Sequence, residues 1–104
     1  MSRHKIFVAP EAGKEIKRLP GNMRQRVKRA IDDLAQDPRP MSSKELDLLR
    51  LAEPVPEVRR LRIENWRILY SIDEVQKVID VFAVRKRPPY DYGDLASLIS
   101  SLAH

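Results

Sequence analysis

From Val58 onward, apolar residues recur with a period of two, in three segments separated by short polar links. This period is typical of strands that bury one face. Asn65 is the turn residue of the first link, residues 73–76 form the second, and the segment 77–87 is rich in β-branched residues. Because such short links join only antiparallel neighbours, the sequence predicts three consecutive antiparallel strands around which the rest must fold.

The side chains of these strands divide between two faces. In the first strand, Leu61 and Ile63 share one face while Arg60 and Arg62 occupy the other. The second strand repeats the division, with Trp66, Ile68, Tyr70 and Ile72 on one face and Arg67, Leu69 and Ser71 on the other. We expect Trp66 and Tyr70 to pack against helices.

The remaining segments complete an α+β pattern. Residues 5–9 form an opening strand, residues 10–19 a helix beginning at Pro10, and residues 22–35 an amphipathic helix with Asn22 as its N-cap. Residues 45–51 fit one or two helical turns or a short strand, and residues 95–102 a short C-terminal helix. The predicted order is β-α-α-β-β-β-α: a small, mainly antiparallel sheet with a helical hairpin on one face and the other face less completely covered.

Composition limits the function classes. The 104 residues make one domain, 1–104, without cysteine, and His4 and His104 lie at opposite ends, so we expect neither a disulfide nor a metal site. No apolar run is long enough to span a membrane and no signal peptide is evident, so we expect a cytoplasmic protein. A net charge of +5 suits nucleic acid, an acidic protein partner, or merely a solvated surface.

The common catalytic constellations are missing from the sequence. The glycines are scattered, no serine or cysteine has a histidine to act as base, and Asp32 and Asp33 do not share a helical face, so no cofactor is expected. What remains is a cationic and phenolic group: Arg59, Arg60, Arg62, Arg67, Arg85, Lys86, Arg87, Tyr90 and Tyr92. Guanidinium groups bind phosphate, and tyrosine stacks on bases or transfers protons. These residues could also simply keep an exposed sheet soluble, which we favour for Arg59.

Four stretches resemble the RelE/ParE superfamily of bacterial toxins. They are "FVAPEAGKEIKRLP", "RQRVKRAIDDLAQDPRP", "VRRLRIENWRILYSID" and "VFAVRKRPPYDYGDL", in the order and spacing of that superfamily. RelE-like members cut messenger RNA in the ribosomal A site, whereas ParE-like members poison DNA gyrase. The resemblance implies a ribosome-dependent endoribonuclease without metal or cofactor. It implies catalytic roles for Arg60, Arg62, Arg67, Arg87 and Tyr90 or Tyr92, and RNA contacts from Arg59, Arg85 and Lys86.

Two further expectations come with the resemblance. Some nuclease members have lysines where this chain has Arg60 and Arg62, and arginine cannot act as a general base. Proton abstraction would then fall to Tyr90, Tyr92 or Lys86. The superfamily also implies a cognate antitoxin as partner, with DNA contacted only through the antitoxin. Leu46, Leu48, Leu49 and Leu51 or the C-terminal helix could supply an apolar docking surface, although we favour core packing for most of these leucines. A ParE-like gyrase inhibitor and a degenerate toxin acting in a repressor complex remain the alternatives.

Overall fold

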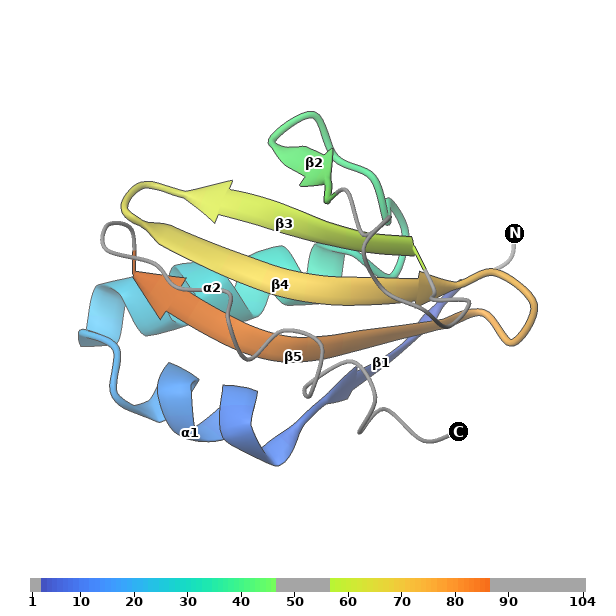
Figure 1. The fold of residues 1–104 in the computed structure, drawn as a ribbon. Coiled ribbons are helices and arrows are strands. Elements are labelled where there is room, and N and C mark those ends of the chain that lie inside the picture. Colours follow the sequence, from blue (N-terminus) through green and yellow to red (C-terminus); the bar gives the residue numbers. More distant parts are fainter. Residues whose placement is uncertain (1–2, 47–56, 87–104) are drawn as a thin grey trace.

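The computed structural model describes residues 3–46 and 57–86, which form a five-stranded sheet and two helices (Figure 1). The strands lie in the order β1-β5-β4-β3-β2. Their bounds are β1 Lys5–Val8, β2 Ser43–Glu45, β3 Glu57–Ile63, β4 Trp66–Asp73 and β5 Val78–Lys86; the helices are α1 Pro10–Lys17 and α2 Gly21–Asp33. The α+β class, dominated by antiparallel pairs, is confirmed.

The three consecutive strands pair as the sequence predicts, whereas the two edges of the sheet differ. β3 is antiparallel to β4, and β4 to β5. β1 lies parallel to β5, and β2 adds a short fifth strand beside β3, which shares only Glu45 with the 45–51 segment where we expected an element. The parallel pair is possible because the helical hairpin and most of the sheet separate β1 from β5, giving the long crossover that such a pair needs.

Both helices lie on one face of the sheet, as predicted (Figure 1). Pro10 opens α1, whose buried side chains are Ala12 and Ile16. The N-cap prediction for the second helix is wrong: α2 already begins at Gly21 with Pro20 as N-cap, and Asn22 lies inside the first turn. There the Asn22 Oδ1 atom accepts the Met23 N–H at 2.9 Å.

The core fills the space between the helices and this sheet face. Tyr70 is fully buried, which raises the pKa of its phenol, and its hydroxyl donates to the carbonyl oxygen of Pro38 at 2.6 Å. Packing against the helices is thus confirmed for Tyr70 and for the partly buried Trp66. The core residues are Ala12, Ile16, Leu19, Met23, Val27, Ile31, Leu34, Leu61, Ile68, Tyr70, Ile72, Ile79, Val81 and Val84.

The second face, which carries Arg60, Arg62 and Arg67 as predicted, is not open over its centre. Leu69 and Ala83 are fully buried there, and Phe82 is 1% exposed. The expectation of a less completely covered face is therefore wrong at this position. Apolar side chains at the centre of both faces explain it, because a sheet with two apolar faces must bury both.

Several predictions fall on residues outside the described ranges. These are the apolar residues 48–51, the basic and phenolic residues from 87 onward, and the helix at 95–102. Neither described helix is long and apolar enough to cross a membrane.

Candidate active site

Three arginines form a row across the second face of the sheet. The Cα atom of Arg62 on β3 lies opposite that of Arg67 on β4, and Arg67 lies opposite Arg85 on β5. Directly paired side chains on one sheet face lie close together. The fold therefore brings together three of the residues selected from sequence, from positions far apart along the chain.

A β-bulge is what brings Arg85 into the row. Tyr70 pairs with Val81 and Leu69 with Ala83, so Phe82 is an extra residue on β5. The bulge reverses the alternation, because Val81 and Val84 both face the helices. Without it, Arg85 would fall on the helix-covered face. Bulges often re-aim side chains beside functional sites.

A second basic pair lies one step along the same face. Arg60 on β3 is paired with Lys44 on β2, so Lys44 joins the face that carries the arginine row. Lys44 and Arg62 are exposed and Arg60 is half-buried. Among the described residues, neither Arg60 nor Arg62 makes an ion pair, which leaves their charge available to an anion.

Arg67 differs from the rest of the row because it is buried, with an exposed fraction of 2%. Its Nη1 donates to the carbonyl oxygens of Glu64 and Trp66, both at 2.9 Å. These carbonyls flank the β3–β4 turn, where Glu64 has a φ of 52°. Glutamate is unusual in this left-handed conformation, so Arg67 also holds a strained turn in place.

Arg59 lies on the opposite face from Arg60 and Arg62. Its Nη1 donates to Glu57 Oε2 at 3.0 Å and its Nε to Ser43 Oγ at 3.0 Å. Glu57 also accepts a bidentate pair of bonds from Arg39, at 2.7 and 3.0 Å. The hydrogen bond from Arg39 is the main cause that holds the pKa of Glu57 below its ordinary value. The structure thus does not bring Arg59 together with the row.

The end of β5 carries two basic residues of the candidate site, Arg85 and Lys86. Arg85 is joined to Glu15 on α1, with 3.2 Å between Nε and Oε2, and Lys86 at the end of β5 is exposed. Arg87, Tyr90 and Tyr92, which would supply the last phosphate contact and the tyrosine, lie outside the described residues. The described part of the site supplies positive charge on a fixed scaffold, which can bind and stabilise a phosphate.

Sequence reasoning missed Lys44 and Glu15 as neighbours of the site. Lys44 lies in a stretch rich in proline, where no strand period marks its face. Glu15 lies on a helix whose polar residues all look alike from sequence, and only its contact with β5 distinguishes it. No short-range pattern could have identified either residue.

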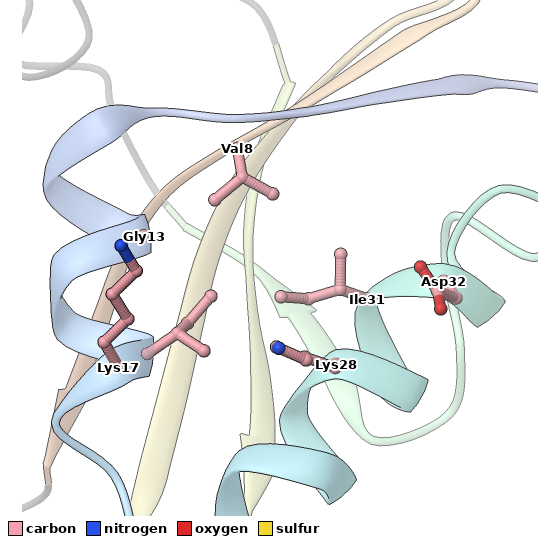
Figure 2. Close-up of a pocket in the computed structure, with 7 residues that line it drawn as sticks. Val8, Gly13, Lys17, Lys28, Ile31 and Asp32 are labelled. Atoms are coloured by element: carbon pink, nitrogen blue, oxygen red, sulfur yellow. The ribbon is translucent and has the colours of Figure 1, made fainter.

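A groove of about 320 Å³ lies away from this site, between the two helices and the edge strand. Figure 2 shows Val8 of β1 and Ile31 of α2 directed into it, with Lys28 between the helices. Val8 is 43% exposed. The groove therefore has an apolar floor beside basic side chains; its lining residues are Val8, Gly13, Ile16, Lys17, Lys28, Ile31 and Asp32.

Solved structures of toxins share this fold. The RelE–RelB complex from Pyrococcus horikoshii OT3 superposes with a TM-score of 0.72 at 20% identity, covering 86% of this chain and 100% of that chain. The RelBE2 complex from Mycobacterium tuberculosis gives 0.66 at 20%, covering 82% and 99%. Isolated RelE from E. coli gives 0.60 at 22%, covering 90% and 95%. A search of individually curated proteins found no match.

Family membership follows from the sequence match, which extends over most of the chain. Residues 6–88 match the family described as the ParE toxin of the type II toxin–antitoxin system parDE. This range includes both helices, every described strand except the first residue of β1, and all three arginines of the row. The chain therefore belongs to the ParE toxin family of type II toxin–antitoxin systems, within the RelE/ParE superfamily.

Proposed function

We propose that this toxin arrests translation by cutting messenger RNA on the ribosome. The observation that carries the proposal is the row of Arg62, Arg67 and Arg85, extended on the same face by Arg60 and Lys44. Within the described residues Lys44, Arg60 and Arg62 form no ion pair, so this face has positive charge that is not neutralised by the protein itself. Clustered guanidinium groups are suited to the charge that develops on a phosphate during transfer.

The reaction is cleavage by the neighbouring 2′-OH. The 2′-oxygen attacks the adjacent phosphorus, the bond to the 5′-oxygen breaks, and the products are a 2′,3′-cyclic phosphate and a 5′-OH end. Arg60, Arg62 and Arg87 bind and neutralise the phosphate, and Arg67 keeps the β3–β4 turn in register. Arginine cannot accept the 2′-OH proton, so Lys86, Tyr90 or Tyr92 does so. The leaving 5′-oxygen takes up a proton in return.

The ribosome would orient the RNA for cleavage, which this surface alone does poorly. The cations are spread over four strands of the sheet, from Lys44 on β2 to Arg85 on β5. Charges distributed in this way give little orientation to a flexible RNA strand. Holding the message in the A site would bring the 2′-OH in line with the phosphate, a contribution that can exceed that of any single side chain.

The antitoxin is the partner that would keep this activity in check. Several similar structures are RelE–RelB complexes, which supports a cognate antitoxin for this chain. From Lys14 to Arg29 the chain has seven cations and one carboxylate, a balance of +6 in a protein whose net charge is +5. An acidic segment with apolar side chains would suit both this charge and the apolar floor of the groove in Figure 2. We therefore expect it to bind there.

Gyrase inhibition is the second candidate, favoured by the ParE family match itself. A gyrase inhibitor would need the fold and the antitoxin groove, but not the arginine row. A degenerate toxin, active only in a repressor complex with its antitoxin and DNA, would need neither nuclease residues nor a gyrase surface.

Primer extension on a defined message tests the proposal. Purified toxin is added to a translation reaction and, in parallel, to the same message without ribosomes. We expect cuts within codons that require ribosomes and disappear with Arg62→Gln. Inhibition of DNA supercoiling without any RNA cuts would instead establish the gyrase target. Absence of both activities and of any growth phenotype would point to the degenerate toxin.

A further inference from the structure

A side chain of α1 accepts a backbone hydrogen bond from β5 beyond the point where β1 ends. β1 ends at Val8, and the Ala9 N–H donates to the Val81 carbonyl oxygen at 2.8 Å. Beyond that point α1 runs beside β5 (Figure 1). Glu15 of α1 then takes the place of a strand, because its Oε1 accepts the Val84 N–H at 2.9 Å. A backbone donor at a partly buried edge needs such an acceptor.

The second oxygen of the same carboxylate binds the arginine row. Glu15 Oε2 accepts the Nε–H of Arg85 at 3.2 Å. The two side chains are 27% and 26% exposed, so solvent screens their attraction only in part. Within residues 3–46 and 57–86, Glu15 is the one carboxylate that forms a salt bridge with a member of the row.

We propose that Glu15 is a positioning residue for the RNA site, acting through Arg85. One oxygen fixes the backbone of β5 after the bulge, and the other fixes the orientation of the Arg85 guanidinium at the end of the row. The inference rests on the proposed function, since it assigns Glu15 a role in the same site. Glu15 itself does not touch the reacting atoms.

This arrangement predicts opposite effects on binding and on cleavage. Loss of the carboxylate removes a negative charge beside the row and the acceptor of the Arg85 Nε–H, so RNA should bind more tightly and with a steeper salt dependence. The guanidinium loses the hydrogen bond that orients its Nε, and Lys86, the next residue, ends β5 immediately before Arg87 in the sequence. Productive geometry should therefore suffer, and small misplacements at such sites cost much of the rate.

Glu15→Gln is the informative substitution. The amide oxygen can still accept the Val84 N–H, while the amide nitrogen cannot accept from Arg85. Glu11→Gln is the matched control, because Glu11 lies one turn earlier on α1 and its salt bridge, to Lys14 at 3.8 Å, is exposed. Both substitutions raise the net charge by one, so a general charge effect would be the same in both.

The test measures two quantities for each full-length variant. With saturating ribosomes, we expect single-turnover cleavage by Glu15→Gln to fall by roughly ten- to a hundredfold, and Glu11→Gln to cleave like the wild type. For a short single-stranded RNA, we expect Glu15→Gln to bind a few-fold more tightly, with a log–log salt slope steeper by up to about 0.7, the value for one added phosphate contact. Equal changes in the two variants would overturn the proposal.

A double-mutant cycle separates positioning from a loss of folding. If Glu15 acts through Arg85, then Arg85→Gln should lower cleavage to a similar degree and the double variant should be no slower than either single variant. A double variant whose loss of cleavage rate is the product of the two single losses would overturn the proposal. The proposal would also fail if Glu15→Gln were less stable, bound RNA more weakly and cleaved more slowly. If the wild type makes no cuts, the proposed nuclease function fails. The comparison of RNA binding by the two variants still decides whether Glu15 affects the binding of RNA to the arginine row.

Discussion

The two ends of the sheet use arginine in different ways. At the end where β3 begins and β4 ends, each arginine meets a carboxylate: Arg39 and Arg59 bind Glu57, and Arg39 also reaches Glu74 at 3.4 Å. At the end with the β3–β4 turn, Arg62 has no carboxylate partner among the described residues, and Arg67 binds backbone carbonyls. The first end is neutralised within the protein, whereas the second retains positive charge at Arg62, although Arg85 there is paired with Glu15.

This difference shows why strongly shifted pKa values do not mark the candidate site. The pKa of Glu74 is lowered to about 2, chiefly by hydrogen bonds from Lys77 and then from His4. The pKa of Arg39 is raised chiefly by its hydrogen bond to Glu57. Both shifts belong to the neutralised end. An ion-pair network that supports the fold perturbs pKa values as readily as a catalytic site does.

Arg67→Gln should have the largest effect on stability. The substitution removes a buried guanidinium and leaves the carbonyls of Glu64 and Trp66 without their donor. We expect a loss of about 3 kcal/mol in unfolding free energy. Thermal unfolding should show a fall in Tm of roughly 12–24 °C. Arg62→Gln, on the exposed neighbour, should leave Tm unchanged; equal losses would contradict the distinction within the row.

Glu57→Gln should destabilise the neutralised end of the sheet without changing the rate of RNA cleavage. Glu57 joins Arg39 and Arg59, and its side chain is 24% exposed. We expect a loss of about 1–2 kcal/mol, since charge-assisted bonds are stronger than neutral ones but partly screened here. Urea denaturation measures it. Cleavage at a temperature well below Tm should remain that of the wild type, and a lower rate would show that the two ends are coupled.

Acid should weaken the neutralised end selectively. A carboxylate with a lowered pKa stabilises the folded state above its unfolded pKa, about 4.3 for glutamate, and loses this contribution as pH falls through the folded value. For Glu74 that window runs from about 4.3 down to about 2. Tm measured across it should fall more steeply for the wild type than for Glu74→Gln. Parallel curves would mean that Glu74 does not contribute to the acid sensitivity.

Glu64→Asn should have the smallest effect. Asparagine adopts the left-handed conformation of Glu64 more readily, while the ion pair of Glu64 with Arg26 is exposed and worth little. We expect a change within about 0.5 kcal/mol, in the stabilising direction. Urea denaturation can detect it if the midpoint shifts without a change in slope. A clear loss of stability would show that the Arg26 pair matters more than the backbone strain.

Local patterns were sufficient for the elements whose neighbours are close in sequence. The alternation around Leu61, Arg62 and Ile68 gave the faces of β3 and β4, because hairpin pairing fixes the register of adjacent strands. The period of α2 likewise identified its buried face at Met23 and Val27. The arginines of the two strands could therefore be assigned to one face from sequence.

Features that depend on distant contacts could not be predicted in this way. Nothing local to β1 specifies that it pairs with β5, and the bulge at Phe82 that turns Arg85 towards the row has no sequence signal of its own. The burial of Arg67 depends on what packs on the second face, and the role of Glu15 depends on where α1 meets β5. In each case, tertiary packing decides the outcome.

A cleavage assay with two charge-matched variants tests the central claim most directly. Single-turnover cleavage of a ribosome-bound message would be measured for the wild type, Arg62→Gln and Arg59→Gln. Both variants lose one positive charge from β3, on opposite faces of the strand. We predict a loss of roughly 10²- to 10³-fold for Arg62→Gln and a wild-type rate for Arg59→Gln. Equal losses, or a wild-type rate for Arg62→Gln, would contradict the assignment of the arginine row as the RNA site.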